Sequence, residues 1–188
     1  MDLVGFTTLT AERGDSDAAD VAQSLYREVR GLLARHEAEE IKTIGDAMML
    51  HCKDPAAGIN LGVRIVERIR ASIAIPPVRV AVHTGTAVHR DGDWYGNGVN
   101  VAARLCSIAG GDEVIVSDDA RAAAGSLDDL QFEERQLHWL KNVPEPVITW
   151  SASAADRPPF NLTGALTRLA PRLRGWSPSC VRPSRVPA

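Results

Sequence analysis

Residues 40–52 of this chain, Glu-Ile-Lys-Thr-Ile-Gly-Asp-Ala-Met-Met-Leu-His-Cys, contain two short apolar runs, Glu40–Ile44 and Ala47–Cys52, separated only by Gly45 and Asp46. A two-residue connection that contains glycine between two such runs is typical of a β-hairpin with a tight turn. The sequence therefore predicts a hairpin here, and it places the carboxyl group of Asp46 at the corner between the two strands.

Helices are predicted on both sides of this hairpin. The apolar residues of the first helix share one helical stripe after a polar turn at residues 14–16, and they are Val21, Leu25, Val29, Leu32 and Leu33. After the hairpin, Asp54 followed by Pro55 is a typical helix start. Apolar residues then recur every four positions until the pattern ends at Pro76 and Pro77, and they are Leu61, Ile65, Ile69 and Ile73.

The rest of the chain up to residue 151 alternates between strand and helix patterns. Val78, Val80 and Val82 alternate with other residues, which indicates a half-buried strand that Gly85 closes. The further predicted elements are a helix over 97–108 ended by Gly110 and Gly111, a strand over 113–116, a short helix over 118–124, and strands near 132–140 and 147–151. Helices and strands that alternate around one hairpin predict an α+β fold, a ferredoxin-like (βαββαβ) sandwich.

The composition fits one folded domain and an extension. The chain has 188 residues, of which 45% are apolar, enough for one core. After Asp156 the sequence has six arginines, no acidic residue and many prolines, so we expect a domain over 1–155 and a disordered basic tail over 156–188. The tail arginines leave 15 basic against 24 acidic residues in the rest, a net charge of about −9 that argues against nucleic acid as a partner.

Cysteine use and hydropathy indicate the compartment. Cys52, Cys106 and Cys180 lack metal-ligand spacing, and an odd number without a signal peptide favours free thiols under reducing conditions. No run approaches the roughly 20 apolar residues of a membrane span. We therefore expect a soluble, cytoplasmic domain, with no membrane contact in this chain.

Two carboxylates are predicted at strand ends. Asp2 precedes Gly5 and the start of a helix at Phe6 and Thr7, and such a turn exposes backbone N–H groups that suit a phosphate. Asp46 lies at the hairpin corner. Two such carboxylates can hold a pair of Mg²⁺ or Mn²⁺ ions about 4 Å apart. Taken alone, an aspartate at a turn is more often only a turn former.

A third segment, DWYGNGVNVAAR at residues 93–104, adds polar groups on one helix face. Asn100 and Arg104 are four residues apart, so on a helix they are neighbours. A carboxamide beside a guanidinium can hold a ribose and neutralise charge on a transferring phosphoryl group. The spacing alone is more typical of a solvated helix face.

The three segments DLVGFT at 2–7, IKTIGDAMM at 41–49 and DWYGNGVNVAAR at 93–104, in this order, resemble the class III adenylyl and guanylyl cyclase family. The resemblance extends from residue 2 to about 151, with weaker matches at VRVAVHTG and LKNVPEPVITW. It implies the catalytic-domain fold of that family and conversion of ATP to cyclic AMP and pyrophosphate. Family members have several more strand residues before the first aspartate, so we expect a biological start upstream or a fragment of a longer cyclase.

The resemblance also implies roles for single residues. It implies that Asp2 and Asp46 bind two Mg²⁺ or Mn²⁺ ions. The backbone around Phe6 and Thr7 would then bind the β- and γ-phosphates. Lys141, in Leu-Lys-Asn, matches a family lysine that reaches the triphosphate.

Further roles concern the nucleoside. The resemblance implies that Asn100 positions the ribose and that Arg104 stabilises the α-phosphoryl group. Lys42 and Asp93 stand at the two base-reading positions, with Asp91 as the competing assignment for the second. An ammonium complements adenine N1 and a carboxylate complements the 6-amino group, whereas guanine presents the opposite pattern. These residue types favour ATP over GTP.

The family assembles its active sites between two subunits, so the resemblance implies a homodimer with two equivalent sites. Other functions stay open: a non-catalytic nucleotide-binding or regulatory module, a guanylate cyclase and, least favoured, a ferredoxin-like RNA-binding domain. The string GGDE at 110–113 is similar to a diguanylate cyclase signature, but here it follows a helix and is interpreted as a helix end. His83 and His89 are interpreted as structural or surface groups.

Overall fold

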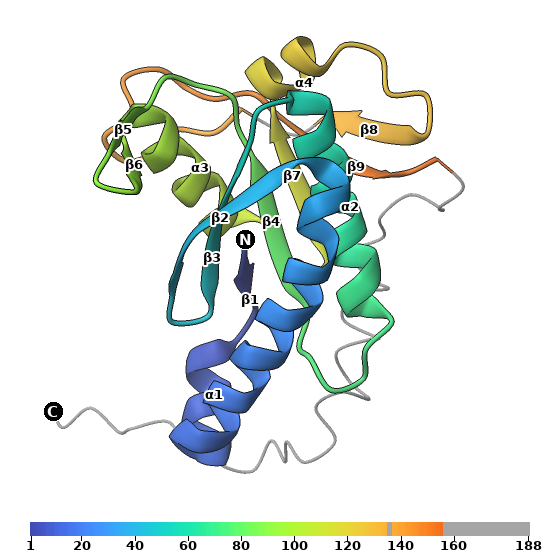
Figure 1. Cartoon of the computed structure of the whole chain (residues 1–188). Helices are drawn as coiled ribbons and strands as arrows, with labels where there is room; N and C mark the ends of the chain where they lie inside the picture. The colour runs from blue at the N-terminus through green and yellow to red at the C-terminus, as the bar shows by residue number, and fades with distance from the viewer. Residues whose placement is uncertain (135–136, 156–188) are drawn as a thin grey trace, which may run out of the picture.

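The computed structural model describes residues 1–134 and 137–155, so the tail over 156–188 and part of the strand predicted near 132–140 lie outside the described residues. The first six elements form the predicted βαββαβ unit (Figure 1): β1 (Asp2–Leu3), α1 (Phe6–Leu33), β2 (Ala38–Ile44), β3 (Ala47–Cys52), α2 (Pro55–Arg70) and β4 (Val78–Val82). A short 3₁₀ turn, η1 (Ala34–His36), connects α1 to β2. The hairpin that the sequence predicted is confirmed.

The remaining elements extend this unit. They are β5 (Val88–Arg90), β6 (Asp93–Tyr95), α3 (Asn97–Ile108), β7 (Glu113–Ser117), α4 (Asp118–Ala124), β8 (Leu130–Glu134) and β9 (Thr149–Ala154). Five strands form a mixed sheet in the order β1-β4-β7-β9-β8, in which β4 and β7 are parallel. The β2–β3 hairpin adjoins its edge, because Met1 and Met48 exchange two backbone hydrogen bonds of 3.1 and 3.0 Å. Such a mutual exchange is an antiparallel pairing, so β3 continues the sheet beyond β1.

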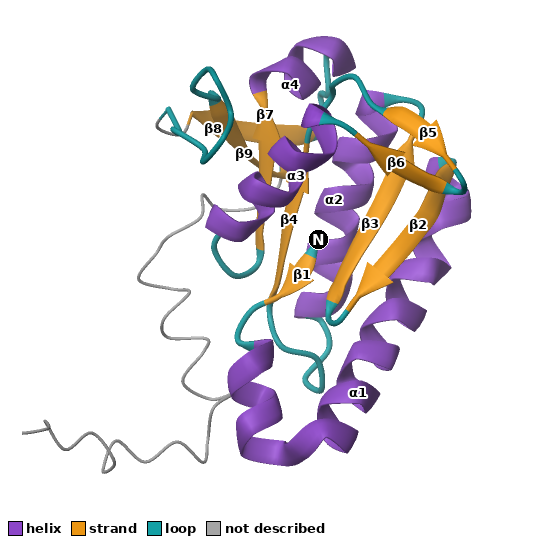
Figure 2. Cartoon of the chain, turned by 90° about the vertical axis from the view of Figure 1, so that its left-hand side faces the viewer, coloured by secondary structure: helices purple, strands orange, loops and turns teal. Residues whose placement is uncertain are grey.

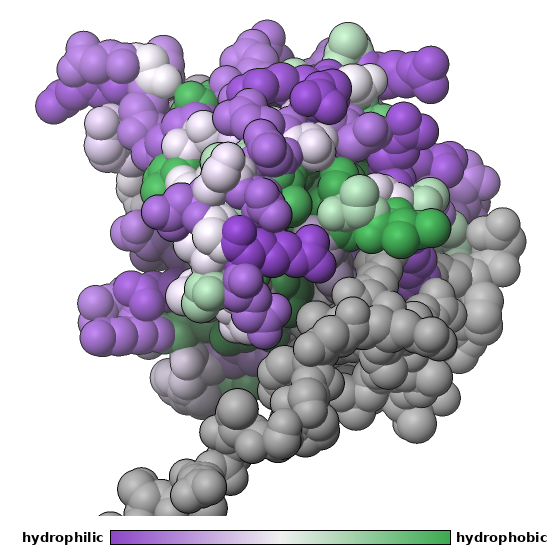
Figure 3. Space-filling view, turned by 90° about the horizontal axis from the view of Figure 1, so that it is seen from below, coloured by the Kyte–Doolittle hydropathy of each residue, from purple (hydrophilic) through white to green (hydrophobic). Residues whose placement is uncertain are grey.

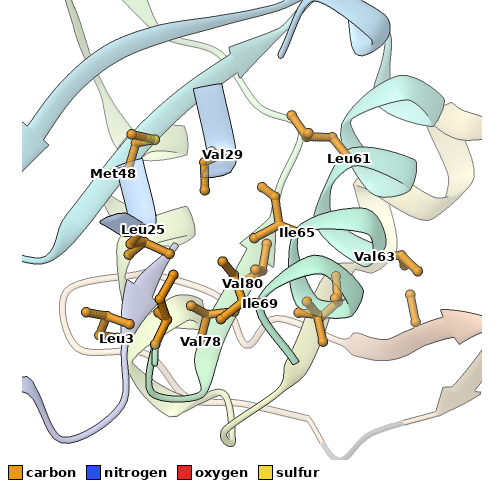
Figure 4. Packing of buried hydrophobic residues seen from close by; sticks show 14 of the residues in the cluster. Leu3, Leu25, Val29, Met48, Leu61, Val63, Ile65, Ile69, Val78 and Val80 are labelled. Carbon is orange, nitrogen blue, oxygen red and sulfur yellow. The ribbon is translucent and has the colours of Figure 1, made fainter. Parts of the chain in front are cut away.

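Helices cover both faces of the sheet (Figure 2). α1, α2 and α4 pack on one face and α3 packs on the other. The alternation of β4 serves both layers, since Val78 and Val80 belong to the larger core while Ala81 packs against the smaller core under α3. Figure 4 shows the larger core between the helices and the sheet, with Leu25, Ile65 and Ile69 among its fully buried side chains.

Two helices differ from the prediction at their ends. α1 begins at Phe6, and the polar turn expected at residues 14–16 is a kink inside it, where Gly14 has a non-helical φ of 85°. Ile73 was predicted to continue the buried stripe of α2, but α2 ends at Arg70 and Ile73 is 92% exposed. The period of four therefore extended past the helix, because Ile73 lies in the loop before Pro76.

The glycine pair after α3 is not the helix cap that was predicted. α3 ends at Ile108, its C-terminal cap is Ala109, and neither Gly110 nor Gly111 has a positive φ. Instead, the backbone N–H of Gly110 donates to the side chain of Glu113 at 2.6 Å. The string therefore follows the end of α3 as expected, but Ala109 caps the helix and the carboxylate of Glu113 holds the turn that comes after it.

The sequence analysis missed the β5–β6 hairpin. Its turn is Asp91-Gly92, and both residues have positive φ, 52° and 77°. Aspartate followed by glycine is a strong hairpin signal, so this dipeptide could have revealed the element. In the described part of the strand predicted near 132–140, β8 forms over Leu130–Glu134, His138 makes an isolated bridge to Val147, and Leu140 is buried in irregular structure.

No helix in the part of the chain that the structure describes is long and apolar enough to cross a membrane. Cys52 and Cys106 are free cysteines, while Cys180 lies outside the described residues. On the face seen from below, hydrophilic and hydrophobic side chains are mixed, with hydrophilic ones more extensive (Figure 3).

Candidate active site

Asp2 and Asp46 are brought together where β1 meets the β2–β3 turn. Gly45 occupies the first central position of this turn with a φ of 60°, a left-handed conformation that favours glycine. Asp46 follows it, and its Oδ2 accepts a hydrogen bond of 3.1 Å from the backbone N–H of Leu3. The strand end and the turn that the sequence indicated therefore place two carboxylates in one half-buried location.

The electrostatics of this pair favour a cation. Burial raises the pKa of Asp46, and the negative charge of Asp2 adds to the shift. Oδ1 of Asp2 is buried without a hydrogen-bond partner within the described residues. Hard divalent cations take carboxylate oxygens as ligands, so an unpaired oxygen beside a destabilised carboxylate fits Mg²⁺ or Mn²⁺. Over the same residues no group of three or more His, Cys, Asp or Glu gathers.

Arg79 on β4 completes this acidic centre, and the sequence analysis missed it. Its Nη2 donates to Oδ2 of Asp2 at 2.8 Å, and its Nη1 donates to the carbonyl of Ser107 at 3.0 Å. The hydrogen bond to Asp2 raises the pKa of Arg79. The alternating strand over 78–82 shows Arg79 only as a polar residue, and its place directly across from Asp2 follows from the register in the structure.

The loop from β1 into α1 presents backbone donors beside the two aspartates. Gly5 is the N-terminal cap of α1 with a φ of 75°, and no side chain caps the helix. The first backbone bond of α1 is donated by Leu9 to Gly5 at 2.9 Å. The N–H groups of Phe6 and Thr7 therefore belong to the helix end that makes no intrahelical bonds, where an anion is stabilised.

Lys42 and Asp93 meet as an ion pair between β2 and β6. Nζ of Lys42 lies 2.5 Å from Oδ2 of Asp93, and Oδ1 of Asp93 accepts a hydrogen bond of 2.8 Å from the N–H of Trp94. The hydrogen bond from Lys42 is the main reason why the pKa of Asp93 is lowered. Tyr95 adds a ring 5.9 Å from the ammonium. The structure thus brings the two expected base-reading residues together, although they are far apart in the sequence.

Asn100 and Arg104 lie one turn apart on α3, as expected. Asn100 is exposed and Arg104 is partly buried. The start of α3 packs tightly, since a Cβ on Gly96 or on Gly98 would lie 3.1 Å from the carbonyl oxygen of Thr86. Glycine at these two positions therefore allows the loop after β4 to approach α3 and fixes where the helix begins.

Lys141 lies in a turn on the surface. It follows the buried Leu140, and Asn142 after it has a left-handed φ of 58°. Within the described residues, hydrogen bonds and ion pairs hold the Asp2–Asp46 centre together and the Lys42–Asp93 pair together, but none joins these groups to each other or to Asn100, Arg104 or Lys141.

Solved structures define the class of protein that this fold represents. Adenylate cyclases from Trypanosoma brucei, solved in their monomeric state, superpose with a TM-score of 0.71 at 23% identity, covering 85% of this chain and 88% of theirs. An adenylate/guanylate cyclase/hydrolase from Silicibacter pomeroyi has a TM-score of 0.66 at 26% identity, covering 75% and 86%. The fold is that of the class III cyclase catalytic domain, and the α+β prediction is confirmed.

The chain belongs to the adenylate and guanylate cyclase catalytic domain family, whose family model matches residues 1–151. A pH-sensitive adenylate cyclase of Mycobacterium tuberculosis is 40% identical over 127 residues, 66% of this chain and 31% of that protein. An adenylate cyclase of Streptomyces griseus is 34% identical over 115 residues, 61% of this chain and 29% of that protein. The matched part thus spans less than a third of these relatives.

Proposed function

We propose that this domain is an adenylate cyclase that converts ATP to 3′,5′-cyclic AMP and pyrophosphate. The observation that carries the proposal is the pairing of Lys42 with Asp93 at 2.5 Å, in the same fold as the Asp2–Asp46 centre. The names of the relatives from Mycobacterium tuberculosis and Streptomyces griseus support the same activity.

Asp2 and Asp46 would hold two Mg²⁺ or Mn²⁺ ions. When bound, such ions act as Lewis acids that activate the ribose 3′-hydroxyl and neutralise the triphosphate. The contribution of the chain is the position of the two carboxylates. Arg79 neutralises part of the charge of Asp2 through its ion pair of 2.8 Å and so helps to hold that carboxylate in place.

The reaction forms one bond and breaks one bond. The ribose 3′-oxygen bonds to the α-phosphorus, the bond to the bridging oxygen of pyrophosphate breaks, and the 3′-hydroxyl proton leaves to solvent or a phosphate oxygen. Asn100 would orient the ribose, and the guanidinium of Arg104 would neutralise the α-phosphoryl oxygens as their charge grows. The N–H groups of Phe6 and Thr7, together with Lys141, would hold the β- and γ-phosphates.

Base selection follows from the charges of Lys42 and Asp93. The ammonium donates to adenine N1, and the carboxylate accepts from the 6-amino group, whereas guanine offers a donor at N1 and an acceptor at O6. The two side chains satisfy each other. ATP must therefore redirect at least part of this ion pair, and only a base with the adenine pattern replaces both partners.

We propose that the complete site forms between two copies of this chain. The Asp2–Asp46 centre of one copy would complement Lys42, Asp93 and the α3 residues of the other, which gives a homodimer two equivalent sites. The catalytic domain would span residues 1–155, and the domain would act in the cytoplasm, where ATP is available and thiols such as Cys52 stay reduced.

The test is product formation by the purified chain with Mn²⁺ and either ATP or GTP. The proposal predicts cyclic AMP and pyrophosphate in equal amounts from ATP, with little cyclic GMP from GTP. Binding of ATP without pyrophosphate release at saturating Mn²⁺ would instead indicate a regulatory module, and preferential cyclic GMP formation would indicate a guanylate cyclase.

A further inference from the structure

Tyr26 is a buried titratable residue that the proposed mechanism does not use. It lies on α1 with only 4% of its surface exposed, and its hydroxyl donates a hydrogen bond to the backbone carbonyl of Gly45. Burial and the nearby charge of Asp46 raise the pKa of its phenol, so it stays a neutral donor. This bond connects the long helix to the turn that carries Asp46, across 19 residues of sequence.

The accepting carbonyl belongs to the peptide group between Gly45 and Asp46. The N–H of that peptide group is the N–H of Asp46, which lies within hydrogen-bonding reach of the carboxylate of the same residue. A peptide group is planar, so holding its oxygen also holds its N–H and the Cα of Asp46. Glycine at position 45 allows many backbone conformations, and a contact that selects one of them acts on the residue that follows.

We infer that Tyr26 is a positioning residue that orients Asp46 through the Gly45 carbonyl and thereby sets how tightly the Asp2–Asp46 centre binds a divalent cation. The inference rests on the proposed function for the identity of that centre. It assigns to α1 a role in the chemistry, since α1 otherwise contributes backbone donors at its start and apolar side chains to the core.

A second contact between α1 and the same hairpin provides a matched control. Arg30, one turn after Tyr26, forms a bidentate ion pair with Glu40 of β2, with N–O distances of 2.6 and 2.7 Å. This pair holds the body of the hairpin rather than its turn. An Arg30→Met variant therefore loosens the same helix from the same strand pair and removes the guanidinium that lies 5.6 Å from the Tyr26 ring, but it keeps the Tyr26 hydroxyl and its acceptor, the Gly45 carbonyl.

The experiment compares the wild-type chain, Tyr26→Phe and Arg30→Met in two assays that need no catalysis. Electron paramagnetic resonance of free Mn²⁺ gives the metal dissociation constant with a non-cyclisable ATP analogue, and amide hydrogen exchange without metal reports on residues 44–48. We expect Tyr26→Phe to raise the Mn²⁺ dissociation constant about fivefold and to speed exchange at these amides by a similar factor. Arg30→Met should leave the metal dissociation constant within about twofold of wild type.

The cyclase assay then separates positioning from general damage. At saturating Mn²⁺ the kcat of Tyr26→Phe should return to near the wild-type value, because the carboxylate itself is intact. Unchanged Mn²⁺ binding and exchange in Tyr26→Phe, or equal shifts in both variants, would overturn the inference. A wild-type chain that binds Mn²⁺ but forms no cyclic AMP, with Tyr26→Phe still binding more weakly, would contradict the proposed activity and leave the positioning role supported.

Discussion

The Asp2–Asp46 centre and the Lys42–Asp93 pair hold aspartate side chains in opposite electrostatic settings. Asp46 lies near Asp2 in a half-buried location, and burial together with the like charge raises its pKa. Asp93 lies against Lys42 in a location that is also partly buried, and the hydrogen bond from the ammonium lowers its pKa. The first region holds two carboxylates with one arginine, whereas the second is neutral by itself.

This difference indicates that the acidic centre depends on a bound cation, whereas the Lys42–Asp93 pair does not. Two carboxylates and one guanidinium leave a net negative charge, so binding of a divalent cation at the acidic centre stabilises the folded chain. An ion pair that is already satisfied gains nothing from a cation, and under the proposed function it would discriminate between nucleotides by the groups that replace its partners. The two regions should therefore respond to different ligands and different substitutions.

The largest expected effect comes from substitutions that disable one region in one subunit and the other region in its partner. Asp46→Ala and Arg104→Ala should each lower cyclic AMP production by about 10²–10³-fold, because each removes a group that the proposed function places at the transferring phosphate. Mixing the two variants in equal amounts should restore about a quarter of wild-type activity, since half of the dimers form one intact site out of two. Activity assays of the separate and mixed variants check this, and mixtures as inactive as the parents would contradict shared sites.

The second prediction concerns the Lys42–Asp93 pair and the preference for ATP over GTP. Replacing Lys42 with Glu and Asp93 with Cys should lower the ratio of kcat/KM for ATP over GTP by about 100-fold, because the donor and acceptor pattern is reversed. Steady-state rates with each nucleotide at saturating Mn²⁺ measure the ratio. An unchanged ratio would show that other residues read the base.

Metal-linked stability tests the acidic centre directly. A cation at about 100 times its dissociation constant stabilises the protein that binds it by about 2.7 kcal/mol. We expect Mn²⁺ to raise the unfolding temperature of wild type but not of Asp46→Asn, while Lys42→Met keeps the wild-type rise. Without metal, Asp46→Asn should be no less stable than wild type, because it removes a buried like charge and keeps an acceptor for the N–H of Leu3. A metal-independent loss of stability in Asp46→Asn would contradict this electrostatic account.

The smallest expected effect is a pH dependence outside both regions. Nδ1 of His83 lies 2.8 Å from Oγ of Ser117, and burial lowers the pKa of the imidazole. Because the unfolded chain takes up this proton near its ordinary pKa of about 6.5 and the folded chain only at lower pH, the stabilisation is present above about 6.5 and is lost as pH falls. The free energy of unfolding, measured with urea, should fall between pH 7.5 and pH 5.5 in wild type. In His83→Gln this fall should be smaller by a few tenths of a kcal/mol. Identical declines in both proteins would assign the pH dependence to other groups.

Much of the fold could be predicted because its signals are local. The Gly45-Asp46 turn, the Asp54-Pro55 helix start and the alternation of Val78, Val80 and Val82 each depend on neighbouring residues, and the structure confirms all three. Ile73 shows the limit of such patterns, since periodicity continues in the sequence after the helix has ended. The β5–β6 hairpin had a local signal at Asp91-Gly92 that was missed.

The site was predicted less completely because its contacts cross the sheet. The pairing of Lys42 with Asp93 could be expected only from the family resemblance, since 51 residues separate them. Arg79 and Tyr26 carried no signal of their function in their own segments, because Arg79 meets Asp2 across a strand pair and Tyr26 meets Gly45 across a helix and a hairpin. Only the arrangement in space shows what these two side chains hold.

The most direct test of the central claim is cyclic AMP formation from ATP with Mn²⁺, measured in parallel for the purified chain and its Asp46→Ala variant. The account predicts cyclic AMP and pyrophosphate in equal amounts from the wild-type chain, and a loss of about 10²-fold or more in the variant while both proteins stay folded by circular dichroism. A folded wild-type chain that binds ATP and Mn²⁺ without forming cyclic AMP, or a variant that keeps its activity, would contradict it.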